Sequence, residues 1–346
     1  VWGSLSGLNP GPLVVQALGL TGIPVVNVFT QCATGTDCLR SAYHMVASGE
    51  RDIAMAIGLD KSPEGFFSYA ANQIRQDPFD TDTIRWKMVG LTNPAYWAMQ
   101  TRLRAEQYGT TERDLALAKV ACSKHAALNP HALYRKVFTV EEVLASPMVV
   151  DPLRLLMMCT VRDGAAAIIL CSKEKARQFT TKPVWVAGIG HGSPLYGDPG
   201  LAVGTVAGAT PTPDSPPTVS ESWLAAKMAY EQAGLGPEDV DFLELPDNSS
   251  WHYLHYPELL GLCTPGEMEH LLRAGETMIG GKLPLNPSGG FASFGEAVGA
   301  QGMLGVCEVV WQLREQAGDR QIKGAKVGFA QTYGMLGNSA ASIYTK

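Results

Sequence analysis

The sequence has no long apolar run, no cluster of basic residues and few charges. Only 17% of its 346 residues are charged and the net charge is −6, so no segment would attract the phosphate backbone of a nucleic acid. No apolar stretch reaches the roughly 18 residues that a membrane-spanning helix needs. Hydrophobic residues make up 46% of the chain, which excludes disorder and predicts a well-buried globular protein of about two domains.

Cysteine and histidine lack the spacings of a metal site, because neither C-x-x-C nor H-E-x-x-H occurs. The seven cysteines are an odd number scattered along the chain, which favours a reducing compartment over a disulfide framework. We therefore expect a cytoplasmic protein without a metal. His252 and His255 lie three residues apart among aromatic residues, and we interpret them as surface or interface residues.

One glycine-rich candidate for a phosphate-binding loop, residues 188–194, does not have the required pattern. The segment GIGHGSP (188–194) does not complete a G-x-G-x-x-G pattern, and we interpret it as a loop. The sequence therefore names no cofactor-binding residues.

Cys32 stands between an apolar run and a segment with helical periodicity. Residues 24–29 (PVVNVF) predict a buried strand, residues 35–48 predict a helix that ends at Gly49, and residues 52–60 predict a second strand. A buried cysteine is usually inert packing. A cysteine at a helix N-terminus has a stabilised thiolate and can act as a nucleophile. Both interpretations of Cys32 stay open on the residues alone.

Downstream, helices and strands continue to alternate. Residues 61–151 are rich in Tyr, Trp, Arg and Pro and lack strand-like runs, so we interpret them as a helical insertion that covers one end of a sheet. Within it, Thr111 to Asp114 marks a helix start. Residues 163–172 then predict a buried strand with small side chains.

The second half repeats the strand, glycine-rich turn and helix pattern of the first. A helix is expected to begin near Ser220 or Ser222, and a later glycine-rich turn opens a helix that runs to about Arg314. Two strands, 326–334 and 341–346, finish the chain. This repetition indicates a duplicated α/β unit in which the two turns face one another.

These segments resemble a known family. The stretch GIPVVNVFTQCATGTDCLRSAYHMVASGERDIAMAIGLDKS is similar to the nucleophile segment of the thiolase superfamily, in particular its sterol-carrier-protein or lipid-transfer-protein type. CTVRDGAAAIIL, GLGPEDVDFLELPD and LNPSGGFASFGEAVGAQGMLGVCEVVWQLR extend the similarity over nearly the whole chain. The resemblance implies an α/β thiolase fold, a duplicated five-layer αβαβα arrangement. Its halves would be 1–178 and 179–346, with an initial strand–helix–strand unit missing before Val1.

The resemblance also implies a catalytic constellation, and this chain departs from it. The acyl-accepting cysteine falls on Cys32. The G-H-P turn of the family corresponds to G-E-A here, with Glu296 in place of histidine. The strand that ends in H-D-C-F or N-E-A-F ends here in P-D-N-S, which includes Asp247 and Asn248. We place both residues in the substrate pocket.

The last loop of the family supplies a cysteine or histidine as acid or base. Here Thr332 occupies that position, followed by Tyr333 and Gly334, within AQTYGMLGN. In the resembling proteins this loop faces the nucleophile turn. We therefore expect Tyr333 to be catalytic and near Cys32, with Thr332 and Gly334 in the substrate pocket.

Three functions are compatible with these changes. Thiolase-like aldolases of steroid side-chain breakdown resemble this family with altered catalytic residues, which implies retro-aldol cleavage of a β-hydroxyacyl-CoA by a pair such as Glu296 and Tyr333. A desolvated glutamate can shuttle protons. The alternatives are an acyltransferase or thiolase that uses Cys32, and a non-catalytic acyl-CoA- or lipid-binding subunit. On the plainer interpretation, Glu296 is an exposed loop carboxylate and Tyr333 a packed aromatic.

The resemblance further implies partners. Acyl-CoA would be the substrate, with coenzyme A entering as its thioester and no bound cofactor. Relatives pair as homodimers through the strand that corresponds to VNVFTQC, and many assemble with a small OB-fold protein that carries a zinc ribbon. No nucleic-acid partner is expected.

Overall fold

The computed structural model describes residues 11–19, 21–61, 92–193, 220–334 and 338–346. Its α-helices are α1 (Gly11–Leu18), α2 (Thr34–Ala47), α4 (Asn93–Tyr108), α5 (Glu112–Ala127), α6 (Val140–Leu144), α7 (Lys173–Phe179), α8 (Glu221–Ala233), α9 (Ser250–Leu259), α10 (Met268–Ala274) and α11 (Gln301–Leu313). Its strands are β1 (Ile53–Asp60), β2 (Met148–Val150), β3 (Leu153–Arg154), β4 (Gly164–Cys171), β5 (Trp185–Gly192), β6 (Phe242–Glu244), β7 (Val327–Gly334) and β8 (Asn338–Thr345). Short 3₁₀ turns are η2 (Leu155–Met157), η3 (Pro237–Asp239) and η5 (Gly318–Arg320), and η4 (Gly290–Phe294) is a π-helical turn.

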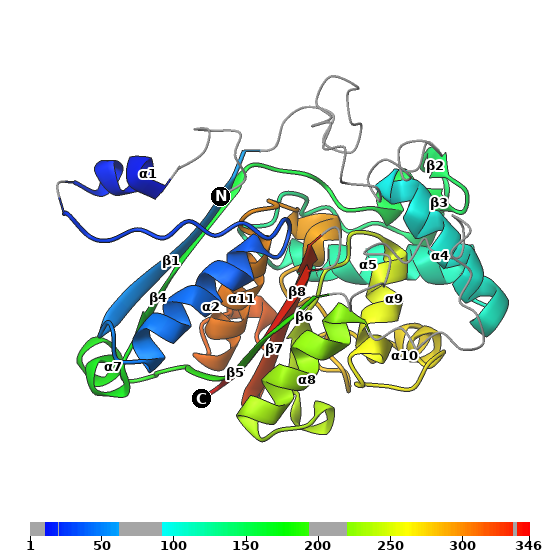
Figure 1. The fold of residues 1–346 in the computed structure, drawn as a ribbon. Helices are drawn as coiled ribbons and strands as arrows, with labels where there is room; N and C mark the ends of the chain where they lie inside the picture. Colours follow the sequence, from blue (N-terminus) through cyan, green and yellow to red (C-terminus); the bar gives the residue numbers. More distant parts are fainter. Residues whose placement is uncertain (1–10, 20, 62–91, 194–219, 335–337) are drawn as a thin grey trace, which may run out of the picture.

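Helices α2 and α11 lie side by side between two sheets (Figure 1). One sheet pairs β1 with β4 antiparallel, and the other has the order β5-β8-β7-β6. The helix N-termini approach closely at Gly35, where an added Cβ would lie 3.2 Å from the carbonyl oxygen of Gly299. Leu39 of α2 and Met303 of α11 are fully buried in the same core. The two glycine-rich turns therefore enter helices that touch, as the repeated sequence pattern predicted.

Residues 188–192 form the end of β5, so their interpretation as a loop is wrong; Pro194 lies outside the described residues. The alternating glycines allow close contact with α8, since an added Cβ at Gly190 would lie 2.0 Å from the carbonyl oxygen of Ala225. On the opposite face of the strand, His191 bonds Asp37 of α2 at 2.8 Å. The glycines therefore serve close packing between β5 and α8. Because they stand where a strand usually has β-branched residues, the sequence did not predict a strand here.

Local signals in the sequence set several boundaries correctly. Helix α2 ends as predicted, with Gly49 at a φ of 76°. Thr111 caps α5 through a capping box with Asp114, and Ser220 caps α8. These signals act through neighbouring backbone groups, which explains why they could be found without the fold.

The predicted strand over residues 24–29 is not formed. The segment is largely exposed, including Val26 at 58% and Phe29 at 54%. An apolar β-branched run predicts a tendency, but a strand also requires a neighbouring strand in register.

The expected helical insertion contains α4 and α5, which pack beside α9 and α10 at one end of the larger sheet (Figure 1); residues 62–91 of it lie outside the described part. Arg104 of α4 is 3% exposed and bonds both Glu258 of α9 and Glu269 of α10. These two ion pairs join the insertion to the second half of the chain. In the described part of the chain, no helix is long and apolar enough to cross a membrane.

Candidate active site

Cys32 lies in a tight, strained turn just before α2. Gln31 has a φ of 55°, in the left-handed region that side chains disfavour. The Thr34 hydroxyl holds the turn, accepting from the Thr30 amide at 2.9 Å and donating to the Gln31 carbonyl at 2.6 Å. Cys32 is partly exposed. The positive end of the helix dipole favours negative charge at this end of α2, which suits a reactive thiol.

The end of β7 packs directly against this turn. The hydroxyl groups of Thr332 and Thr36 are 2.9 Å apart. Gly334 has no room for a side chain, since an added Cβ would lie 2.4 Å from the carbonyl oxygen of Thr30. From α11, the Gln301 amide donates to the Cys32 carbonyl at 3.3 Å. The structure therefore brings Thr332 and Gly334 to the Cys32 turn.

Glu296 is 1% exposed, so its interpretation as an exposed loop carboxylate is wrong. Asn248 donates its side-chain N–H to Oε1 of Glu296 at 2.9 Å. Burial raises the pKa of Glu296 to about 7, against the lowering effect of hydrogen bonds from Cys159 and Asn248. Oε2 of Glu296 and Oδ1 of Asn248 are both buried without a hydrogen-bond partner among the described residues.

A segment from the first half of the chain fixes the position of Glu296. The Cys159 amide donates to the Asn248 carbonyl at 2.9 Å. One residue later, the Thr160 carbonyl accepts from the Glu296 amide at 2.7 Å, and the Arg162 amide donates to the Glu296 carbonyl at 2.9 Å. The residues between η2 and β4 thus hold the two site-bearing turns of the second half together.

Asp247 anchors the loop that leads to Glu296. Its carboxylate accepts from the amides of Phe291 at 2.5 Å and Ala292 at 3.3 Å, at the start of η4. The Cys122 thiol lies 3.2 Å from the same carboxylate. Burial raises the pKa of Asp247, although these three donors oppose the shift. The Asp247 oxygens are therefore directed to the loop, and Asp247 helps to hold the loop that carries Glu296 in place.

Tyr333 is partly buried, and its hydroxyl lies 2.8 Å from Nε2 of His252. His252 is 1% exposed, so its interpretation as a surface or interface residue is wrong. Helix α9, which carries it, contains Pro257 and was not predicted. Burial raises the pKa of Tyr333 well above its usual value, and Cys32 and Glu296 raise it further. Tyr333 is therefore held as the neutral phenol, whose hydroxyl can both donate and accept a hydrogen bond.

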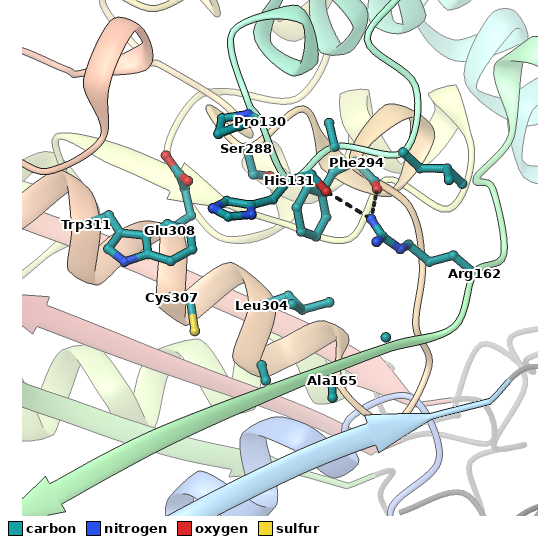
Figure 2. Close-up of a pocket in the computed structure, with 14 residues that line it drawn as sticks. Pro130, His131, Arg162, Ala165, Ser288, Phe294, Leu304, Cys307, Glu308 and Trp311 are labelled. Atoms are coloured by element: carbon teal, nitrogen blue, oxygen red, sulfur yellow. Dashed lines mark hydrogen bonds between the residues drawn. The ribbon is translucent and has the colours of Figure 1, made fainter.

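A cavity of about 610 Å³ lies beside α11 and the loop that contains Ser288 and Phe294 (Figure 2). Phe294 and Arg162 line it together with His131 and Trp311, whose rings stack 5.4 Å apart. The Arg162 guanidinium donates to the carbonyls of Phe294 at 2.8 Å and His131 at 3.1 Å. Cys32, Glu296 and Tyr333 do not line this cavity.

Two family profiles match the chain. "Thiolase, N-terminal domain" matches residues 1–174, and "Thiolase C-terminal domain-like" matches residues 211–346. The chain belongs to the thiolase family. Its arrangement of sheet, helix pair, sheet and outer helix is the α/β thiolase fold that the sequence predicted; the division at residues 178 and 179 remains a prediction.

Relatives support this family assignment. The thiolase chain is 37% identical over 330 residues to an acetyl-CoA acetyltransferase of Methanothermobacter thermautotrophicus, covering 95% of this chain and 82% of that protein. It is 33% identical over 347 residues to sterol carrier protein 2 of Homo sapiens, covering 96% of this chain and spanning only 60% of that protein's length. It is 32% identical over 321 residues to the benzoylsuccinyl-CoA thiolase subunit BbsB of Thauera aromatica, covering 92% and 78%.

Among solved structures, the thiolase chain is similar to one described as "Ltp2-ChsH2(DUF35) aldolase". The TM-score is 0.79 at 26% identity, covering 98% of this chain and 85% of that one. A monomeric SCP2-thiolase like protein of Mycobacterium smegmatis shares the fold, with a TM-score of 0.61 at 20% identity, covering 92% and 61%.

Several residues of this thiolase site were not found from its sequence. His252, Cys159 and Gln301 each contact a predicted site residue or its backbone, and Ser249 contacts His252. No motif in the sequence marks these residues, because single polar residues of this kind also occur in purely structural positions. Within the described ranges, no group of three or more His, Cys, Asp or Glu residues is arranged to hold a metal.

Proposed function

We propose that this thiolase-family protein cleaves a β-hydroxyacyl-CoA by a retro-aldol reaction. The observation that carries the proposal is Glu296, a buried carboxyl with a pKa raised to about 7 and with Oε2 unpaired among the described residues. A group of this kind can accept and return a proton near neutral pH. The similarity to a solved aldolase of the same family supports this choice.

The reaction then follows from the two groups. The Glu296 carboxylate takes the proton of the β-hydroxyl, the Cα–Cβ bond breaks, and the β-carbon leaves as a ketone or aldehyde carbonyl. The electron pair of the broken bond forms the enolate of the shortened acyl-CoA. Tyr333 donates a hydrogen bond to the enolate oxygen. The proton on Glu296 moves to the α-carbon and completes the products without a covalent acyl-enzyme.

Acyl transfer through Cys32 is the second candidate. Its support is the strained turn at Gln31 and the position of Cys32 ahead of α2. Relatives named acetyl-CoA acetyltransferase add to it. A non-catalytic acyl-CoA- or lipid-binding subunit is the third candidate and needs neither group to react.

Partners belong to the same proposal. The structural neighbour is described as "Ltp2-ChsH2(DUF35) aldolase", a name that joins two components. We infer that this chain likewise works with a small second protein, of the OB-fold and zinc-ribbon type that the sequence resemblance implied. The exposed apolar side chains of residues 23–29 support a homodimer formed through that segment.

The test is product analysis of the purified protein. With a β-hydroxyacyl-CoA, retro-aldol cleavage yields equal amounts of a shortened acyl-CoA and a carbonyl compound, both detectable by liquid chromatography and mass spectrometry. Intact-protein mass spectrometry after incubation with acyl-CoA shows whether Cys32 carries an acyl group. An acyl group on Cys32 without cleavage of the β-hydroxyacyl-CoA would contradict the retro-aldol proposal and support acyl transfer. Neither signal, with retained acyl-CoA binding, would leave the binding role.

A further inference from the structure

His252 lies in an aromatic enclosure at the start of α9. Its ring meets the edge of Trp97 at a centroid distance of 5.1 Å and stacks on Tyr256 at 5.8 Å. It also stacks on Tyr333 at 5.5 Å with an angle of 17° between the planes. This packing fixes the plane of the imidazole, so that its two nitrogen atoms point in set directions.

The partner of Nδ1 determines where the ring proton lies. The backbone amide of Ser249 donates to Nδ1 of His252 at 3.0 Å, and the Ser249 hydroxyl lies 2.8 Å from the same atom. A backbone N–H can only donate, so Nδ1 must offer a lone pair. Burial disfavours the charged imidazolium and lowers the pKa of His252 well below its usual value. The neutral ring therefore carries its proton on Nε2.

That tautomer orients the Tyr333 hydroxyl. Nε2–H of His252 donates to the phenol oxygen across 2.8 Å. The phenol proton is then free to point to a different acceptor, and donation to its oxygen strengthens the phenol as a donor. Tyr333 is partly buried and lies between Thr332 and Gly334, both of which pack against the Cys32 turn. We infer that the acceptor of its proton is in the candidate active site.

One turn of the chain serves both candidate catalytic groups. Asn248 binds the Glu296 carboxyl through its side chain, and the next residue, Ser249, fixes His252 through its backbone. The positions of Glu296 and Tyr333 are thereby coupled through two consecutive residues.

We propose that His252 is a positioning residue that holds Tyr333 with its hydroxyl proton directed at the substrate oxygen. Its kinetic consequence rests on the proposed function, whereas the tautomer and the hydrogen bond do not.

The hydrogen bond is tested without substrate. In protein labelled with ¹⁵N-histidine at pH 7, we expect one ring with the shifts of a neutral Nε2–H tautomer that disappears in His252→Gln. An Nδ1–H tautomer or an imidazolium at this residue would overturn the proposal. Because this readout needs no turnover, it decides the proposal even if no β-hydroxyacyl-CoA is cleaved; absence of cleavage would reject the proposed function alone.

The kinetic test separates positioning from general packing. His252→Leu removes the donor, and we expect kcat to fall about tenfold or more with little change in KM, because removing an oxyanion donor outright costs about 10²–10³. His252→Gln keeps an N–H near the Nε2 position and should recover part of kcat. His255→Leu, three residues along α9, is the matched control. His255 stacks on Trp251, and its variant should retain kcat.

Coupling to Tyr333 is the decisive comparison. If His252 acts through Tyr333, His252→Leu should have no further effect on kcat in a Tyr333→Phe background. Independent, multiplying losses in the double variant would show that His252 has only a structural role and would overturn the proposal.

Discussion

Glu296 combines an acidic side chain with an interior that disfavours its charge. The sequence presents it as one carboxylate in a glycine-rich turn, whereas the fold leaves it 1% exposed beside a single amide donor. Its raised pKa makes it a candidate proton carrier and also a source of instability. Three predictions at the residue scale follow from these properties.

The first concerns stability and pH. The Glu296 pKa rises from 4.5 to about 7 on folding, so the native state binds more protons than the unfolded state between these values. Stability is therefore lost as pH rises from about 4.5 through 7, by about 3 kcal/mol in total. Glu296→Gln should raise the free energy of unfolding at pH 8 and change it little at pH 4.5. Urea unfolding at both values measures this, with Glu106→Gln on the exposed side of α4 as control.

The second concerns the roles of two candidate groups. In retro-aldol cleavage, Glu296→Gln should lower kcat by about a hundredfold, the scale of a general base. Cys32→Ala should have a much smaller effect, since Cys32 would only line the pocket. Steady-state kinetics with one β-hydroxyacyl-CoA compare the variants. A loss of more than about a hundredfold from Cys32→Ala alone would restore the covalent mechanism.

The third concerns the pH dependence of turnover. A general base acts in its deprotonated form, so kcat/KM should rise with pH and level off above about 7, the pKa of Glu296. Initial rates across this range measure the profile. A profile that is flat from pH 5 to 9 would remove Glu296 from the role of base.

At the scale of secondary-structure elements, contact between β5 and α8 depends on the absence of side chains. Gly188, Gly190 and Gly192 all lie on the face of β5 that meets the α8 backbone. The opposite face of β5 contacts α2 through His191 and Asp37. The strand thus connects the outer helix with the helix that follows the Cys32 turn.

Gly190→Ala tests this arrangement. Its Cβ would lie 2.0 Å from the carbonyl oxygen of Ala225, so α8 would have to shift, and we expect a loss of about 1–3 kcal/mol in the free energy of unfolding. Gly305→Ala is the control, because its Cβ would lie 3.3 Å from Glu244 Cβ and α11 would gain helix propensity. Chemical denaturation of both variants gives the comparison, and equal stabilities would contradict close packing at β5.

At the scale of the whole molecule, the segment from Ile23 to Phe29 exposes several apolar side chains next to one another. Val26 is 58% exposed and Val25 is 37% exposed. If two copies pair through this segment, Val26→Asp should convert a dimer into a monomer, because it would place a charge in an apolar interface. Light scattering after size-exclusion chromatography measures the mass. A wild-type monomer, or a variant that remains dimeric, would exclude this segment as the dimer contact.

Short-range signals in the sequence determined several local elements of this protein and its family, although they failed for residues 24–29, for the end of β5 and for α9. The Thr111 capping box, the Gly49 stop and the apolar strand β1 act through residues within a few positions of each other. The Cys32 turn, and the presence of Glu296 where the family has histidine, could be recognised in the sequence for the same reason. Each depends on a few consecutive residues. These signals also predicted that Thr332 and the turn near Cys32 would meet, through the family resemblance.

Only the tertiary structure decided which groups share an environment. His252 and Tyr333 are 81 positions apart, and Asn248 and Glu296 are 48 positions apart. Whether such residues meet depends on how α9 and the Glu296 loop pack, which no local pattern encodes. Burial then sets their chemistry, because the same glutamate exposed to water would keep a low pKa and the same histidine would titrate near neutrality.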